Sequence, residues 1–472
     1  MAALSNVPQI ALLIIVVIVI FNTIIFVHEL GHFWAAKWRG LKIDRFQIWF
    51  GKPIWSKTIN GVQYGLGWIP AGGFVALPQM APMESIEGGN LDKEPLPPIT
   101  PLDKIIVAFA GPLFSFLLAL TAAVGVYIVG KPKDFAPTQV IAEVLPDSPG
   151  DKAGLKAGDK ITHINGKAVN GWDGRLDSIF MQIVTSEGDD IDFTVERPGE
   201  SAPLTLTSHF DIPETLWWQR KGLRQVGIAP ESGWVLITSV MPGSPAAAAG
   251  IEEMDRVVSV DGNEYKTLDE VRDYIRSRGE QPIAFVLERK KELLNFTIQP
   301  KVPIKPEGQQ AMIGVGFDES PVYEKTIIHP KPLEQISDTV EMMWVTITRV
   351  ISPSSSLGVQ HLSGPVGIAR LQYRMLNMDH PWQRILGFMV LLNINLAILN
   401  MLPFPVLDGG HITLALAEAV AGRPVKAKAL EFVQMGFAML LFGLMIFVTT
   451  KDISDGIRPG GEKGAEYVFP ES

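Results

Sequence analysis

Four long apolar segments alternate with polar stretches along the chain. They cover about residues 8–33, 105–129, 385–402 and 429–449. Each is close to the ~20 residues that a helix needs to cross ~30 Å of hydrocarbon. The first segment lacks the basic start and the small-residue cleavage site of a secretory signal peptide. We therefore predict four transmembrane helices, the first of them retained, in contact with a lipid bilayer.

Basic residues around the first apolar segment predict the orientation of the chain. No lysine or arginine precedes it, whereas Lys37, Arg39, Lys42 and Arg45 follow it. Because basic residues favour the cytoplasmic side, we expect the N-terminus outside. Alternation then places the C-terminus and the stretch from about 131 to 377 outside. It also brings the C-terminal ends of the first and third helices together on the cytoplasmic side.

The stretch expected outside the membrane contains an internal repeat. Residues 141–166 align without a gap onto residues 237–262. The shared positions include Ser148, Gly154 and Asp159 in the first copy and Ser244, Gly250 and Asp255 in the second. Each copy reads as a strand, a Ser-Pro turn, a short helix ending at Ala-Gly, a second strand and an Asn-Gly or Asp-Gly turn. This pattern resembles tandem PDZ domains of the bacterial type, at about 135–225 and 226–322.

PDZ domains commonly bind an extended peptide as an added strand. The resemblance therefore implies recognition of peptides or protein C-termini. The alternative is that the two domains only pack over the membrane domain and obstruct large substrates. The sequence leaves both readings open.

A His-Glu-x-x-His motif stands near the end of the first apolar segment. His28 and His32 are four residues apart, so on a helix both imidazoles lie on one face and can reach a single ion. Glu29 is placed to take a proton from a metal-bound water. Ionisable groups at the lipid boundary are costly, about 2.5–3.5 kcal/mol each at a helix centre on insertion scales. This location favours a metal site over an ordinary surface helix with two histidines.

A third metal ligand is expected from another part of the chain. There are no cysteines, so the ligands must be nitrogen and oxygen atoms, and catalytic zinc takes three protein ligands. Asp408 follows the third apolar segment, at the end expected beside His28 and His32. Its alternative role is only to cap the helix that follows. We expect His411 to lie near the metal without binding it.

Two prolines interrupt the chain just before Asp408. Pro403 and Pro405 break the third helix and free backbone groups, which is tolerated at membrane depth only beside a cavity. We therefore expect this turn, together with Asn400, to help bind substrate.

Taken together, FVHELGH in the first helix, N-x-x-P-x-P-x-L-D-G-G at the third and the PDZ repeats between them resemble the bacterial site-2 protease family of intramembrane zinc metalloproteases. The resemblance spans nearly the whole chain. It implies one Zn²⁺ per chain bound by His28, His32 and Asp408, with Glu29 as general base. It also implies that Asn400 binds substrate or stabilises the oxyanion.

The same resemblance implies the biological setting. The family cleaves membrane-spanning segments of single-pass proteins, typically anti-sigma factors or remnant signal peptides, in regulated intramembrane proteolysis. We accordingly expect a multi-pass protein of the bacterial inner membrane whose active site lies near the cytoplasmic side.

Two further segments match the family with different fidelity. Residues 68–78 match a hairpin that enters the membrane, and its edge strand at Gly73–Leu77, including Phe74 and Val75, is expected to pair with unwound substrate. The alternative is a surface hairpin that packs on the first helix. In FAGPLFS, Ser115 stands where asparagine is usual, so we expect a polar contact there to be shortened or lost.

The predicted fold class is a multi-domain membrane protein with four transmembrane α-helices, two α+β PDZ domains and a membrane-associated β-hairpin. Outside the PDZ domains, the expected regions are 1–130 with two transmembrane helices and the hairpin, 330–380 as an interfacial helix or linker, 381–455 with the other two transmembrane helices, and 456–472 as a tail. Whether 330–352 acts as a gate or only as a linker stays open.

The net charge bears on possible partners, and two other functions fit parts of the sequence. The formal net charge is −9 and no basic tract carries interleaved aromatics, so nucleic acid is not expected as a partner. A non-catalytic membrane-anchored PDZ scaffold or sensor is the alternative function. A protease anchored by one helix and acting on soluble substrates would need its motif on a water-exposed helix.

Overall fold

The computed structural model describes residues 7–80, 99–133, 138–172, 174–216, 218–230, 232–265, 268–289, 292–305, 310–321, 326–422, 427–454 and 469–470. The chain forms two compact units. One, the membrane unit, consists of residues 1–132, 327–348 and 362–453. The other, the repeat unit, consists of residues 133–326, 349–361 and 454–472.

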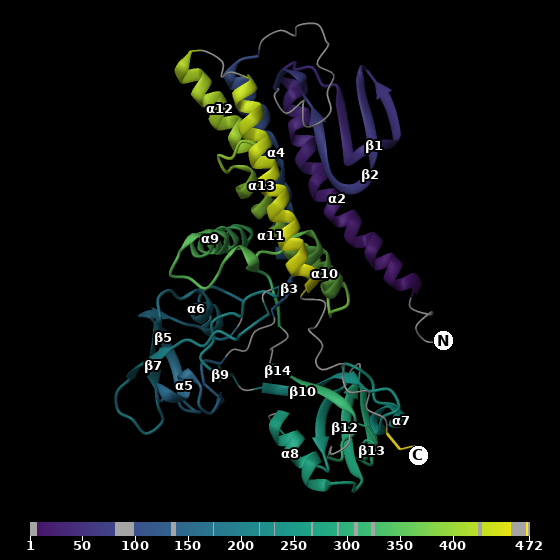
Figure 1. Ribbon diagram of the computed structural model, residues 1–472, viewed down its shortest axis with the longest axis vertical. Helices are drawn as coiled ribbons and strands as arrows, with labels where there is room; N and C mark the ends of the chain where they lie inside the picture. Colours follow the sequence, from purple (N-terminus) through teal and green to yellow (C-terminus); the bar gives the residue numbers. More distant parts are fainter. Residues whose placement is uncertain are drawn as a thin grey trace. The chain divides into compact units, whose positions relative to one another are not determined.

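Four helices in the described residues are long and apolar enough to cross a membrane, as the sequence predicted. The apolar spans are Leu13–Trp38 in α2 (Val7–Trp38), Pro101–Val129 in α4 (Pro101–Val129), Pro381–Asn400 in α11 (Pro381–Asn400) and Phe432–Ser454 in α13 (Ala427–Ser454). Shorter helices are α9 (Pro332–Ile351), η2 (Val359–His361), α10 (Pro365–Leu376) and α12 (Asp408–Ala421) (Figure 1). Short strands β3 (Lys131–Lys133) and β15 (Thr326–Ile328) form a two-stranded sheet.

Helix α4 is the centre of the membrane unit, because α2, α11 and α12 all pack against it. Small side chains allow this close packing. Ala119 and Ala123 are fully buried against α11 residues such as Ile394. Where α4 meets α2, a Cβ atom on Gly31 would lie only 2.4 Å from the backbone oxygen of Ala110. Small residues at such positions let the backbones of two membrane helices approach each other.

The first turn of α4 is fixed by a capping box. Thr100 accepts a hydrogen bond from the backbone of Asp103, and the Asp103 carboxylate accepts one from the backbone of Thr100. Arg39, one residue beyond α2, pairs with the same carboxylate at 2.6 Å. The end of the first span and the start of the second are therefore held together.

A long hairpin links α2 to α4 and lies beside α2 (Figure 1). Strands β1 (Arg45–Ile59) and β2 (Val62–Ala76) meet at a tight turn, where Asn60 and Gly61 both have positive φ, as an Asn-Gly hairpin turn requires. The sequence placed a smaller hairpin at 68–78. The paired strands start at Arg45, and the chain reverses at the Asn-Gly turn and again between 66 and 73, because 45–48 run in the same direction as 63–66 and in the opposite direction to 73–76. The membrane-associated hairpin at 68–78 stays a prediction.

The register of the hairpin leaves one segment at an edge. Residues 45–48 pair with 73–76 on one side and with 63–66 on the other, and 63–66 pair in turn with 55–58. Among the described residues no other strand pairs with 73–76, which we call the edge segment. Leu77, expected to belong to it, lies between β2 and the short helix η1 (Pro78–Met80).

The first repeat domain has its own core around Ile161, Phe193 and Val195. Its elements are β4 (Glu143–Val144), α5 (Pro149–Lys152), β5 (Lys160–Ile164), β6 (Lys167–Ala168), α6 (Ile179–Thr185), β7 (Asp190–Glu196), β8 (Leu204–His209) and β9 (Ile228–Ala229). One sheet has the order β6-β5-β7-β8, and β4 pairs with β9. Val226 is buried in this core. The domain therefore extends to Ala229 rather than ending at 225, because β9 completes its sheet structure.

The second repeat domain has a separate core around Ile237, Phe285 and Leu287. Its elements are β10 (Ser232–Val240), α7 (Pro245–Ala249), β11 (Arg256–Val260), α8 (Leu268–Arg278), β12 (Ile283–Arg289), β13 (Glu292–Ile298) and β14 (Val315–Pro321). They form one sheet with the order β13-β12-β11-β10-β14 (Figure 1).

The repeated sequence positions build the same polar network in both domains. In the first, Arg197 donates two hydrogen bonds to the buried Asp159 carboxylate and one to the Gly154 carbonyl. In the second, Arg289 does the same with Asp255 and Gly250. The shared aspartate and glycine are thus structural residues that tie the short helix to the sheet.

Candidate metal centre

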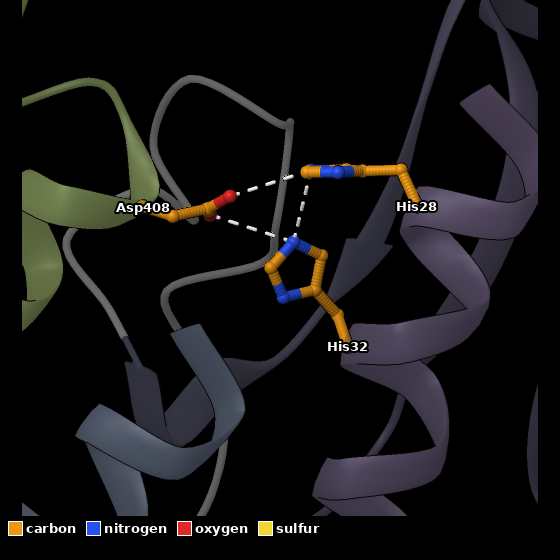
Figure 2. Close-up of side chains that lie close together, drawn as sticks. All are labelled: His28, His32 and Asp408. Carbon is orange, nitrogen blue, oxygen red and sulfur yellow. Dashed lines mark hydrogen bonds and ion pairs between the residues drawn. The ribbon is translucent and has the colours of Figure 1, made fainter. Parts of the chain in front are cut away.

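Two imidazoles from α2 face the same side of the helix. His28 and His32 lie one turn apart, and their Nε2 atoms are 3.3 Å from each other (Figure 2). Their rings are nearly perpendicular, with an interplanar angle of 80°. Both side chains are largely shielded, with exposed fractions of 9% and 12%.

Asp408 reaches the same point from α12. One carboxylate oxygen is 3.3 Å from His28 Nε2, and the other is 3.4 Å from His32 Nε2 (Figure 2). The buried Oδ2 atom has no hydrogen-bond partner. The structure therefore brings together the three residues that the sequence analysis chose as metal ligands.

The turn before Asp408 depends on two glycines. A Cβ atom on Gly409 would lie 2.2 Å from the Met401 oxygen, and one on Gly410 would lie 2.0 Å from the Phe404 oxygen. Any side chain at these positions would push α12 away from the end of α11. Asp408, the first residue of α12, would then move away from the imidazoles.

The spacing of the three donor groups fits a tetrahedral ion. Zinc binds imidazole nitrogen and carboxylate oxygen at about 2.0–2.2 Å, usually in tetrahedral geometry. Two ligands of such an ion are about 3.3–3.6 Å apart. The two imidazole nitrogens are 3.3 Å apart, Asp408 Oδ2 is 3.3 Å from His28 and Asp408 Oδ1 is 3.4 Å from His32, and one ligand atom from each residue lies within 4.8 Å of the other two. His28, His32 and Asp408 could therefore hold one divalent ion and leave a fourth position for water or substrate.

Helix α4 orients both imidazoles by contacting their Nδ1 atoms, on the side of each ring away from Asp408. The Nδ1 atom of His32 donates to the Val107 carbonyl at 2.8 Å, because a carbonyl can only accept. His28 Nδ1 is 3.0 Å from the Ser115 hydroxyl, and Ser115 is fully buried. A polar contact is therefore present at Ser115, and how it compares with that of an asparagine stays a prediction. The shorter side chain still reaches its partner, because α2 and α4 are so close.

A glycine in α4 gives His32 its space. A Cβ atom on Gly111 would lie 2.1 Å from His32 Nε2. The Gly-Pro motif of the second span thus keeps the ligand-bearing face of α2 clear. Sequence reasoning noted this motif without assigning it a contact.

Glu29 lines a cavity of about 1110 Å³ beside the metal ligands. Asn400, the last residue of α11, lines the same cavity, and its Nδ2 atom is 3.5 Å from His28 Nε2. A cavity of this size, with a carboxylate and a carboxamide next to three metal-binding groups, can accept an extended peptide segment.

The edge segment forms another wall of this cavity. Gly73, Phe74 and Val75 all line it. Phe74 stacks on Phe50, with ring centroids 6.2 Å apart. A Cβ atom on Gly73 would lie 3.4 Å from Glu29 Cγ, so the strand passes close to the carboxylate.

The two prolines before Asp408 shape the turn, whereas Val406 and Leu407 line the cavity. Gln434 of α13 donates to the Pro405 carbonyl at 3.1 Å, which satisfies one backbone group that the break leaves free. A direct contact of Pro403 or Pro405 with substrate stays a prediction.

Besides Glu29 and the three candidate ligands, three other ionisable residues line the cavity. His411 lines the cavity three residues after Asp408, as expected of a neighbour. Burial lowers the pKa of His411 below its ordinary value, which favours a neutral imidazole. Arg45 and Lys52 reach the cavity from β1. No local pattern marked them, because their position depends on the folding of the hairpin.

Comparison with known protein families gives an independent result. A family model described as peptidase family M50 matches residues 16–444. The match includes both repeat domains, the whole of α4 and α11, and parts of α2 and α13.

Relatives match over nearly their whole length. Protease RseP of Yersinia pestis is 29% identical over 91% of this chain and 96% of its own. Regulator of sigma-E protease RseP is 28% identical in Salmonella typhimurium and 27% in Escherichia coli, in each case over 91% of this chain and 96% of the relative. Among solved structures, the PDZ domain of an SdrC-like protein from Listeria monocytogenes matches 19% of this chain and 90% of its own, with 24% identity and a TM-score of 0.17.

Proposed function

The chain belongs to peptidase family M50, and on this basis we propose that it is an intramembrane zinc metalloprotease that cleaves transmembrane segments of other membrane proteins. The observation that carries the proposal is the convergence of His28, His32 and Asp408, with donor groups 3.3–3.4 Å apart, from two helices far apart in sequence. A scaffold would have no need for such a cluster beside a cavity.

We propose one Zn²⁺ per chain at this cluster. When bound there, zinc supplies a Lewis acid that polarises a carbonyl and makes water acidic enough to lose a proton near neutral pH. Glu29 lines the same cavity, and its carboxylate is the proposed acceptor of that proton and its donor to the leaving amine. The Asn400 amide is the proposed hydrogen-bond donor to the oxyanion that develops at the substrate carbonyl.

The edge segment is the proposed docking strand for substrate. A transmembrane helix shields its own peptide bonds, so a substrate must unwind before its carbonyl can react. Backbone groups of 73–76 on the open edge offer the unwound segment replacement hydrogen bonds, as in strand addition. Gly73 places this strand close to Glu29.

Substrate class and location follow from the family and from the apolar helices. We propose single-pass membrane proteins of the anti-sigma-factor or remnant-signal-peptide type as substrates, in the bacterial inner membrane. Both chain termini and the repeat domains are proposed to lie outside the cytoplasm, because basic residues follow α2. The repeat domains are proposed to be PDZ domains that bind peptides.

The deciding experiment compares two variants of the zinc-loaded protein in detergent. Glu29→Gln should fold, retain zinc and lose cleavage of a transmembrane peptide by at least ~100-fold, as expected for removal of a general base. His28→Ala should lose the metal as well. Zinc content, thermal unfolding and peptide cleavage are measured for both. Wild-type cleavage by Glu29→Gln contradicts the assignment, and a purified wild type without metal or activity favours the scaffold.

A second experiment tests the docking strand. Backbone N–H groups along an edge strand point alternately toward the neighbouring strand and toward the open edge. Phe74→Pro and Val75→Pro therefore remove N–H groups on opposite sides. We expect one variant to weaken the hairpin and the other to keep it folded while losing cleavage. Full cleavage by the variant that keeps a folded hairpin counts against strand pairing.

A further inference from the structure

Two residues of the C-terminal tail pack on the second repeat domain. Phe469 is only 8% exposed. Its Cζ atom lies 3.1 Å from the place that a Cβ atom on Gly314 would take. Lys301 donates a hydrogen bond from Nζ to the Pro470 carbonyl at 3.3 Å. An aromatic ring and the carbonyl of the next residue are thus both held by one domain.

The loop in contact with Phe469 has no side chain at Gly314, a position next to the ring. Lys301 and Met312 exchange two backbone hydrogen bonds, of 3.1 and 3.0 Å. Just after them Gly314 has a positive φ, and its carbonyl accepts from Met241 at 2.9 Å. A side chain at position 314 would collide with Ser244 and meet the Phe469 ring. Glycine leaves room for the aromatic ring.

The first repeat domain shows the same loop, and the two described residues of the tail, 469 and 470, lie on the second domain instead. Asp211 and Gln225 exchange the equivalent backbone hydrogen bonds, of 2.8 and 2.9 Å, and Leu145 donates to the Gly227 carbonyl at 2.8 Å. Asp211 thus takes the position of Lys301 and cannot donate to a peptide carbonyl. Leu145, beside Gly227, is 51% exposed. At equivalent positions, the first domain therefore has an acidic side chain and the second a basic one.

We propose that the loop at Lys301 and Met312–Gly316 of the second repeat domain is a binding site for an aromatic-containing peptide, and that the chain's own tail occupies it through Phe469. Covalent linkage gives the tail an effective concentration on the order of mM. The chain's own tail therefore occupies the site even if its affinity is weak, and a peptide from another protein must displace the tail to bind. This inference does not require proteolysis, so it stands or falls separately from the proposed function.

The absence of cysteine in the chain permits a clean crosslinking test. Val302 is 41% exposed next to Lys301. We expect Val302→Cys with Pro470→Cys to crosslink with a short bismaleimide in the full-length protein in detergent. Adding Phe469→Ala should lower the yield at least five-fold, whereas Phe469→Tyr, which keeps an aromatic ring, should retain most of it. Equal crosslinking yields with alanine and with phenylalanine at position 469 overturn the proposal.

The first repeat domain supplies the matched control. Ile212 occupies the position equivalent to Val302, so Ile212→Cys with Pro470→Cys should crosslink far less. A synthetic peptide of residues 464–472 should compete with the 302–470 crosslink, and the same peptide with alanine at position 469 should not. Equal crosslinking at 212 and 302, or equal competition by both peptides, contradicts a specific site.

Discussion

At the scale of single residues, the metal site depends on contacts behind the ligands. Ser115 and the Val107 carbonyl hold the Nδ1 atoms of the two imidazoles. Such contacts fix which nitrogen faces the metal, and their loss typically weakens metal binding 10–100-fold. The orientation of His28 and His32 is thus set by a different helix from the one that carries them.

Ser115→Ala should therefore weaken zinc binding about 10-fold or more, because His28 loses the partner of its Nδ1 atom. Chelator competition measures the zinc affinity. Thr121→Val is the matched control on the same helix, since the Thr121 hydroxyl bonds only to its own helix, at the Leu117 carbonyl. Equal affinities in Ser115→Ala and wild type would show that the contact does not orient the ring.

The closeness of the three candidate ligands could be predicted from the sequence, but the contacts that orient them could not. His28 and His32 share a short motif, and Asp408 follows from the need for a third ligand at the same membrane depth. The partners of Nδ1 come from α4, where one is a backbone carbonyl and leaves no mark in the sequence. Ser115 was singled out, but its contact with His28 was not predicted, because the closeness of α2 and α4 depends on residues such as Gly31.

At the scale of elements, each repeat domain is held by a buried ion pair. Asp159 is 1% exposed in its pair with Arg197. Burial alone would raise the pKa of Asp159, but the hydrogen bonds from Arg197 and from the backbone of Lys156 lower it below its ordinary value. Its contribution to stability is therefore present above about pH 3.9 and is lost as the pH falls through the lower pKa of the folded state.

Asp159→Asn should destabilise the first repeat domain by about 3 kcal/mol, because it leaves Arg197 without its partner charge. Hydrogen exchange of the β5 amides in the full-length protein measures the opening free energy. Between pH 5 and pH 3 the wild type should lose more stability than the variant. As a control, Glu196→Gln breaks the exposed pair with Lys160 and should cost at most ~1 kcal/mol. Similar costs for the two variants contradict the structural role of Asp159.

Helices with a long apolar sequence could be predicted. Strands whose position depends on a partner distant in sequence were harder to predict. The four apolar helices are plain in the sequence because each exceeds the length of a membrane span. The strands before residue 68 were not predicted, since the pairing of 45–48 with 73–76 joins residues from both ends of the segment. For the same reason, β9 was assigned to the wrong repeat domain.

At the scale of the whole molecule, the metal site connects distant parts of the membrane unit. A ligand that binds only the folded protein stabilises it by about 2.7 kcal/mol at 100 times its Kd. Adding zinc to the metal-free protein should raise the midpoint of thermal unfolding, and His28→Ala should abolish this rise. An equal rise in His28→Ala would place the stabilising ion elsewhere.

The order in which the ribosome makes these segments gives the split site a further consequence. His28 and Glu29 are made before both repeat domains, whereas Asp408 is made after them, 376 residues beyond His32. A partly synthesised chain carries the base and two imidazoles but lacks the carboxylate that completes the centre. If His28, His32 and Asp408 hold the metal, the centre cannot be complete until the chain beyond α11 has been made.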